Sequence, residues 1–171
     1  MKNVVLIGFM GTGKTSAGRA LAQRLGRAFV DLDAKIEKEA GRFAREGEAA
    51  FRAMEKEMVK RMASRRALVI ATGGGTVKDA ANVEALRKNG AIVCLTASVD
   101  AVLARTARVG DRPVLDQKDA GDRRRAVEDL MEERRALYEV ADYCVDTSDL
   151  SPLQVVDEIV GYLKREGVFR A

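Results

Sequence analysis

Residues 8–15 read GFMGTGKT and follow the apolar run VVLI at residues 4–7. This stretch fits G-x-x-x-x-G-K-[ST], the pattern of a loop whose backbone N–H groups surround a phosphate. The apolar run predicts a strand before the loop, and residues 15–26 have helical spacing after it. That order directs the N–H groups and the positive end of the helix toward one anion. The motif therefore predicts a nucleoside triphosphate site.

The residues of this phosphate loop have separate predicted roles. Gly8, Gly11 and Gly13 permit a close approach of the backbone and unusual dihedral angles. Lys14 is expected to reach the β- and γ-phosphates, and the Thr15 hydroxyl to bind Mg²⁺. A glycine-rich turn with an incidental lysine is the alternative, which the flanking strand and helix argue against. The residues predicted to contact the nucleotide here are Gly11, Thr12, Gly13, Lys14, Thr15 and Ser16.

Alternating strand and helix patterns predict the fold class. The strands are expected at residues 3–8, 28–32, 67–71, 91–95 and 143–146. Their apolar runs are continuous, which is typical of parallel strands covered by helices on both faces. Helical spacing occurs at residues 15–26, 34–41, 47–65, 79–90, 98–108, 124–141 and 151–167. The order predicts an α/β fold, a three-layer sandwich of the P-loop NTPase type with a five-stranded parallel sheet.

Single residues predict several helix ends. Gly26, Gly90 and Gly167 are expected to end three of the helices, because glycine readily adopts the left-handed conformation found there. Ser151 is expected to cap the last helix, with Pro152 in its first turn.

Composition limits the class of protein. A chain of 171 residues, 47% hydrophobic and 33% charged, suits one soluble domain spanning residues 1–171. It contains no run of about 20 apolar residues, so we expect a cytoplasmic protein that does not bind membranes. The net charge of +4, without aromatic residues beside the arginines, argues against a nucleic-acid partner. We expect a monomer.

The inventory of reactive residues also limits the chemistry. The chain has no histidine, which excludes an imidazole base and a histidine-ligated zinc ion. Proton transfer must therefore depend on carboxylates, lysine or tyrosine. Cys94 and Cys144 lie in apolar runs with β character, and we expect both to be buried as small hydrophobic residues.

Two aspartates end the second predicted strand, in the sequence DLD at residues 31–33. Ligands of doubly wound sheets bind at the carboxyl ends of the strands, so Asp31 and Asp33 should face the phosphate loop. Alternation along a strand would turn both carboxylates to the same side. One could hold the water shell of a metal ion while the other orients a hydroxyl group. A helix N-cap is the alternative role for Asp33.

Two further segments suggest a second ligand beside the nucleotide. Arg52 and Glu55 lie three positions apart on one helical face and can pair, although an ordinary surface ion pair is the alternative. Residues 72–76 read TGGGT at the end of the third predicted strand. Consecutive glycines there favour a close approach of the backbone to a ligand over a tight turn.

Residues 109–122, VGDRPVLDQKDAGD, fit neither a helix nor a strand. A loop of this length in a compact domain is usually either disordered or an active-site lid. Because it contains Arg112, we interpret it as a mobile lid at about residues 107–122.

Taken together and in order, GFMGTGKT, DLD, FRAME, GGG, RPVL and RALYE resemble the shikimate kinase family over essentially the whole chain. The resemblance implies transfer of the γ-phosphoryl group of ATP to the 3-hydroxyl of shikimate, with Mg²⁺ as cofactor. It also implies a helical segment for substrate binding at about residues 33–61.

The resemblance assigns roles to individual residues. Asp33 would bind the acceptor hydroxyl, and Asp31 would support Mg²⁺ together with Thr15. Arg52 and Arg134 would hold the carboxylate of shikimate. The glycines that the resemblance places at the same substrate are Gly73, Gly74 and Gly75.

The resemblance further implies that Arg112 reaches the transferring phosphate and that Arg105 packs against adenine. Lys14, Asp33 and Arg112 would be the catalytic residues. Phosphoryl transfer depends mainly on positioning and on neutralisation of charge, which these side chains could supply.

One departure from the family pattern keeps alternatives open. The segment between Gly41 and Gly47 is shorter than in most shikimate kinases, which affects the expected shape of the substrate pocket. The first alternative is a P-loop kinase for another small hydroxy acid, such as gluconate. The second is a non-catalytic nucleotide-binding regulator. This role leaves four residues without a function, namely Asp33, Arg52, Arg112 and Arg134.

Overall fold

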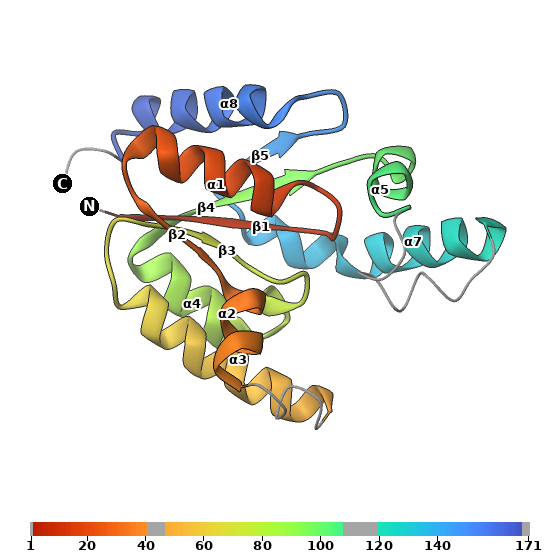
Figure 1. The fold of residues 1–171 in the computed structure, drawn as a ribbon, viewed down its shortest axis with the longest axis horizontal. Coiled ribbons are helices and arrows are strands. Elements are labelled where there is room, and N and C mark those ends of the chain that lie inside the picture. Colours follow the sequence, from red (N-terminus) through yellow and green to blue (C-terminus); the bar gives the residue numbers. More distant parts are fainter. Residues whose placement is uncertain (1, 41–46, 108–119, 169–171) are drawn as a thin grey trace.

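The computed structural model describes residues 2–40, 47–107 and 120–168. Five parallel strands form one sheet in the order β2-β3-β1-β4-β5 (Figure 1). The strands are β1 (Asn3–Gly8), β2 (Ala28–Asp31), β3 (Leu68–Ala71), β4 (Gly90–Thr96) and β5 (Tyr143–Asp146). Their positions confirm the predicted strands to within one residue at each end. The start of β3 differs because Ala67 has a φ of 59°, a left-handed conformation that precedes the strand.

Helices cover both faces of the sheet, which confirms the predicted three-layer fold (Figure 1). One face carries α1 (Lys14–Leu25) and α8 (Pro152–Arg165). The other carries α2 (Leu32–Ala40), α3 (Glu48–Ala63) and α4 (Ala80–Lys88). Beyond the carboxyl end of β4 lie α5 (Val99–Arg105) and α7 (Ala120–Arg135). Two short 3₁₀ helices are η2 (Thr76–Lys78) and η3 (Ala136–Val140).

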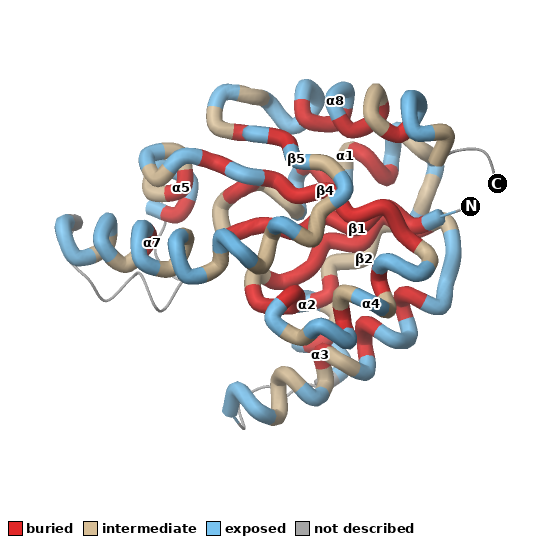
Figure 2. Tube along the Cα trace, turned by 180° about the vertical axis from the view of Figure 1, so that it is seen from behind, coloured by how far each residue is buried: buried red, intermediate tan, exposed pale blue. Residues whose placement is uncertain are grey.

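The position of β1 in the middle of the sheet explains why its sequence is apolar at successive positions. Val4 and Leu6 pack toward α1 and α8, whereas Val5 and Ile7 belong to the core on the opposite face. All four side chains are 0% exposed, and Figure 2 shows β1 buried along its length. A strand between two helical layers requires apolar side chains on both of its faces.

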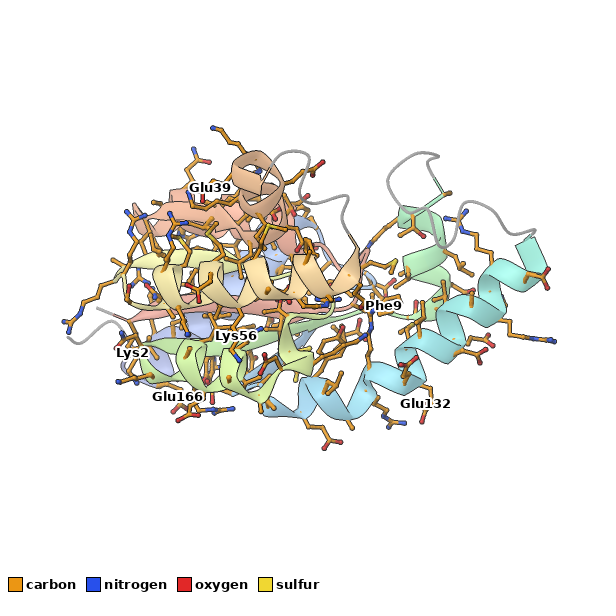
Figure 3. All side chains as sticks on the ribbon, turned by 90° about the horizontal axis from the view of Figure 1, so that it is seen from below. Lys2, Phe9, Glu39, Lys56, Glu132 and Glu166 are labelled. Atoms are coloured by element: carbon orange, nitrogen blue, oxygen red, sulfur yellow. The ribbon has the colours of Figure 1, made fainter. Side chains whose placement is uncertain are left out.

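A third apolar cluster connects the phosphate loop to α5 and α7. Phe9 packs there with Val102 of α5 and Val127 of α7, and Figure 3 shows its position between the sheet and α7. The helix predicted at residues 124–141 begins earlier, at Ala120, and its last part is the 3₁₀ helix η3. Residues 120–122 of the predicted lid are therefore helical. The rest of that lid from residue 108 lies outside the described residues, as does most of the shortened segment after Gly41.

Two of the three predicted glycine helix ends are confirmed. Gly26 and Gly167 have φ angles of 64° and 67°, just after the ends of α1 and α8. The prediction for Gly90 was wrong, because Asn89 caps α4 and Gly90 begins β4. A Cβ atom at Gly90 would lie 2.6 Å from the carbonyl oxygen of Leu86, so close packing of helix and strand explains this glycine.

At the start of α8, the predicted N-cap is confirmed. The Ser151 side chain accepts the N–H of Gln154 and the Gln154 side chain accepts the N–H of Ser151, which forms a capping box. Pro152 occupies the first turn, as predicted.

The expectation for the cysteines was half correct. Cys94 is buried in β4, but Cys144 is exposed because β5 is the edge strand of the sheet. Burial raises the pKa of the Cys94 thiol to about 12. None of the helices among the described residues has the length and apolarity needed to cross a lipid bilayer.

Candidate active site

The phosphate loop has the backbone that its sequence predicts. Gly8, Gly11 and Gly13 have φ angles of 143°, 74° and 96°, values that side chains disfavour. A Cβ atom at Gly8 would lie 2.3 Å from the carbonyl oxygen of Leu95. The loop leads directly into α1, which begins at Lys14. Its N–H groups and the helix N-terminus thus form an anion-binding turn.

Three side chains of this loop make hydrogen bonds, two of them within the loop and one to the end of β2. Lys14 Nζ donates to the carbonyl oxygens of Gly8 at 2.6 Å and Phe9 at 2.9 Å, so the ammonium group lies over the loop. The Thr15 hydroxyl donates to Asp31 Oδ2 at 3.1 Å. The Thr12 hydroxyl is buried and donates to the carbonyl of Phe9 at 2.7 Å. Thr12 therefore shapes the loop with its side chain and can offer a ligand only its backbone.

A cleft of about 660 Å³ lies beside the phosphate loop. It brings together most of the residues that the sequence predicts for the site, namely Gly11, Gly13, Lys14, Thr15, Ser16, Asp31, Asp33, Arg52, Gly73, Gly74, Gly75, Arg105 and Arg134. It is also lined by residues that sequence reasoning did not select, namely Met10, Ala34, Glu37, Phe51 and Thr72. Arg112 lies outside the described residues.

Asp31 and Asp33 both face this cleft, but not through the predicted strand alternation. β2 ends at Asp31 and α2 begins at Leu32, so Asp33 belongs to the first turn of a helix. Asp31 Oδ1 accepts the N–H of Ala34 at 3.1 Å, which gives Asp31 the capping role considered for Asp33. The Asp33 carboxylate lies in the cleft beside the backbone of the glycine loop at residues 73–75.

The surroundings of Asp33 favour its protonated form. Although the side chain borders the open cleft, protein atoms enclose its other sides, and this burial raises the pKa of the carboxyl group. The negative charges of Glu55 and Asp31 raise the pKa further, whereas Lys14 and Arg52 lower it. A carboxylate of increased basicity is suited to accept a proton or a hydrogen bond from a hydroxyl group.

Each glycine of the glycine loop lies against one charged side chain. Cβ atoms at Gly73 and Gly75 would lie 2.5 Å from Asp33 Oδ1 and from Arg52 Nη2, respectively. A Cβ atom at Gly74 would lie 2.8 Å from Arg134 Nη1. The sequence predicted that a ligand approaches this backbone. In the structure, charged side chains of α2, α3 and α7 occupy the space that a side chain at residues 73–75 would need, which explains why these residues are glycines.

The two arginines differ in their partners. Arg52 Nη1 lies 2.9 Å from Oε1 of Glu55, which is 1% exposed, so the alternative of a surface ion pair was wrong. Arg134 makes no ion pair with any described carboxylate, and its guanidinium lies 5.7 Å above the ring of Phe9. Its Nε is buried without a hydrogen-bond partner among those residues. Arg134 can therefore offer its charge to an anionic ligand.

Arg105 connects the phosphate loop to the segment after β5. It donates to the carbonyl of Gly11 at 3.2 Å and to the Thr147 hydroxyl at 3.0 Å. A smaller pocket of about 170 Å³ lies next to these groups, bordered also by Ser16 and Pro152. The position is compatible with the predicted contact between Arg105 and a base, which stays a prediction.

Comparison with known proteins identifies the family. A family model described as "Shikimate kinase" matches residues 10–164. The chain belongs to the shikimate kinase family. A shikimate kinase of Pelotomaculum thermopropionicum is 45% identical over 169 residues, with 96% of each chain covered. That of Thermodesulfovibrio yellowstonii is 43% identical over 170 residues, again with 96% of each covered. Members of this kinase family use ATP as the co-substrate.

Solved structures support the same assignment. A shikimate kinase from Acinetobacter baumannii in complex with shikimate superimposes with a TM-score of 0.88 at 37% identity, covering 97% of this chain and 94% of that one. A gluconokinase from Sinorhizobium meliloti has a TM-score of 0.64 at 22% identity, covering 98% of this chain and 95% of its own. The gluconokinase likeness shows a shared fold only.

The sequence did not predict two residues that support the glycine loop, Tyr138 and Thr76. The Tyr138 hydroxyl donates to the carbonyl oxygen of Gly74 at 3.0 Å. The Thr76 hydroxyl donates to Glu55 Oε2 at 2.9 Å and accepts the N–H of Gly73 at 3.1 Å. Their sequence signal is their place beside GGG and within RALYE, because Glu55 lies 21 residues from Thr76 and Gly74 lies 64 residues from Tyr138.

Proposed function

We propose that this chain transfers the γ-phosphoryl group of ATP to the 3-hydroxyl of shikimate, giving shikimate 3-phosphate and ADP, through the residues of the cleft described above. The observation that carries these assignments is the meeting of Asp33, Arg52 and Arg134 on one glycine loop, beside the phosphate loop. A carboxylate and two guanidinium groups complement an acceptor that has hydroxyl groups and one carboxylate. Family membership and the shikimate complex of the Acinetobacter relative support the choice of acceptor.

The carboxylate and the 3-hydroxyl of the acceptor bind to different residues. Arg134, which has no carboxylate partner among the described residues, and Arg52 hold the carboxylate of shikimate. Asp33 accepts a hydrogen bond from the 3-hydroxyl and orients its oxygen toward the phosphate loop. The segment at about residues 33–61 then contributes the walls of the acceptor site through α2 and α3.

The phosphoryl group passes from ATP, bound by the phosphate loop, to the acceptor hydroxyl, held by Asp33. The N–H groups at residues 11–16 and Lys14 bind the phosphates of ATP, for which the Lys14 ammonium must leave the carbonyls of Gly8 and Phe9. Since the transition state is loose, positioning matters more than base strength, and Asp33 receives the hydroxyl proton as the bond to phosphorus forms. Arg112, assigned from the sequence alone, adds positive charge at the transferring group.

Thr15 and Asp31 fit a magnesium site. The hydroxyl and the carboxylate lie 3.1 Å apart at the edge of the cleft, and both are oxygen ligands of the kind that Mg²⁺ prefers. Bound Mg²⁺ would neutralise charge on the phosphates. Because Asp31 Oδ1 also accepts the N–H of Ala34, the carboxylate is held in place by the start of α2. A cytoplasmic location and a monomeric state stay predictions from the sequence.

A coupled assay of ADP release with Mg-ATP tests the proposal. We expect saturable ADP release with shikimate, and little with quinate or gluconate in parallel reactions. ADP release with gluconate alone would keep the nucleotide site but refute the assignment of the acceptor. No release with any of the three acids would refute the proposed transfer reaction.

A further inference from the structure

Thr76 occupies a position from which it can join the two halves of the acceptor site. It begins η2 immediately after the glycine loop, and its side chain is 0% exposed. Its hydroxyl donates its single proton to Glu55 Oε2 and accepts the N–H of Gly73. The side chain does not line the cleft, so it can act on a substrate only through these two neighbours.

The first neighbour, Glu55, holds Arg52. Its carboxylate is 1% exposed, and each of its oxygens has one side-chain partner: Oε1 pairs with Arg52 and Oε2 with Thr76. A buried carboxylate is tolerated only when such partners replace the lost water. Loss of the Thr76 hydroxyl would leave Oε2 unpaired, so the carboxylate would be expected to rotate and move Arg52 with it.

The second neighbour, Gly73, limits the position of Asp33. A Cβ atom at Gly73 would lie 2.5 Å from Asp33 Oδ1, so the backbone there is in close contact with the carboxylate. The N–H of Gly73 is bound to Thr76 Oγ1 at 3.1 Å. A shift of this backbone by a few tenths of an ångström would therefore change the space in which the Asp33 carboxylate lies.

The backbone of Thr76 is held independently of its hydroxyl. Asn82 Nδ2 donates to the Thr76 carbonyl at 3.1 Å, and the Thr76 N–H donates to the carbonyl of Gly73 at 3.3 Å. Substitution of the side chain can thus remove the hydroxyl while the turn stays in place.

We propose that Thr76 is a positioning residue that couples Arg52 to Asp33. It sets the separation between the group that binds the acceptor carboxylate and the group that binds the acceptor hydroxyl. The inference rests on the proposed function, because the two groups need a fixed separation only if one acceptor molecule bridges them. The hydroxyl itself touches neither substrate.

The test compares Thr76→Val, which preserves the shape of the side chain, with Thr76→Ser, which preserves the hydroxyl. For Thr76→Val we expect KM for shikimate to rise about tenfold and kcat to fall about tenfold, since two buried polar groups lose their partner and the acceptor is misplaced. KM for ATP should stay within about twofold of the wild-type value, because the phosphate loop is not part of the network. Thr76→Ser should restore both shikimate parameters to within about threefold.

A matched control separates positioning from stability. Ile159→Val removes one buried methyl group in the core on the opposite face of the sheet. It should lower Tm while leaving KM and kcat unchanged, and all variants are assayed well below their own Tm. The inference is overturned if Thr76→Val keeps the wild-type shikimate kinetics, or if Thr76→Ser is impaired as strongly as Thr76→Val. Absence of shikimate-dependent ADP release from the wild-type chain would instead refute the proposed function.

Discussion

The phosphate loop and the glycine loop both lie at the carboxyl ends of neighbouring strands, yet they are built in different ways. The phosphate loop depends on residues close in sequence, since Lys14 bonds to Gly8 and Phe9. The glycine loop depends on Asp33, Arg52 and Arg134, which come from three separate helices. The conformation of the phosphate loop is therefore largely a local property of the chain, whereas the acceptor site is a product of the tertiary structure.

If this difference is correct, the acceptor site can be destroyed without loss of nucleotide binding. We expect Asp33→Asn to lower kcat by about 10³-fold, because the amide cannot receive the hydroxyl proton. The affinity for ADP, measured by calorimetry, should be nearly unchanged. A fall in ADP affinity as large as the fall in kcat would contradict the separation of the two loops.

The same variant has an expected effect on stability. The pKa of Asp33 is raised in the folded chain, so ionisation of this carboxyl group costs stability, fully so above the folded pKa. The cost shrinks as the pH falls below the folded pKa and is gone below the ordinary pKa of the unfolded chain. Asp33→Asn should therefore leave Tm at neutral pH unchanged or higher. A clear decrease in Tm would show that the carboxylate stabilises the fold instead.

Lys14→Met is the converse experiment on the phosphate loop. Loss of the ammonium group should lower kcat by about 10²-fold or more, because no other loop side chain neutralises the phosphates. ATP affinity should fall, while binding of shikimate, measured by calorimetry without nucleotide, should remain. Unchanged turnover would refute the role of this loop in ATP binding.

Gly75→Ala tests the contact between the glycine loop and Arg52. The added Cβ would lie 2.5 Å from Arg52 Nη2, so the guanidinium must move. We expect KM for shikimate to rise about tenfold with KM for ATP unchanged, as measured by steady-state kinetics. Gly161→Ala in α8 is the matched control, since the added Cβ would meet Nη1 of Arg165, the end of a flexible side chain, at 3.3 Å. That change should preserve the kinetics, and similar kinetic losses in both variants would refute a specific contact.

Tyr138→Phe should have the smallest effect. It removes the hydrogen bond from the Tyr138 hydroxyl to the carbonyl of Gly74, one of several supports of the glycine loop. We expect KM for shikimate to rise about two- to fivefold, in line with the loss of one neutral hydrogen bond. Tyr143→Phe removes an exposed hydroxyl at 3.4 Å from Glu158 and serves as the control in the same assay. A larger effect from Tyr143 would contradict the assignment.

The strands show how much of the fold could be read from the chain. Continuous apolar runs predicted all five strands. The central strands β1, β3 and β4 lie between helical layers and are buried almost throughout, whereas the edge strands β2 and β5 are only partly buried. Helix boundaries were less accurate. Gly90 was assigned to a helix end, but it begins β4. The residue is a glycine because the backbone of α4 approaches it closely, a contact that no local pattern reveals.

The candidate site shows the same limit. Asp31 and Asp33 were placed correctly in the cleft for a reason that was wrong, since the chain enters α2 directly after Asp31. The pairing of Arg52 with Glu55 was also predicted, but not the burial that makes Glu55 depend on Thr76. Burial depends on what the rest of the chain places around a residue, so sequence spacing cannot supply it.

By itself, the sequence determined the phosphate loop, the strand order along the chain and the residue types available for chemistry. These follow from short-range rules, because a loop conformation and a strand pattern are set by neighbouring residues. Only the tertiary structure decided that three glycines would each face one charged side chain, and that Thr76 would join two of their supports. Those contacts link segments far apart in the chain, and close packing of the folded core selects them.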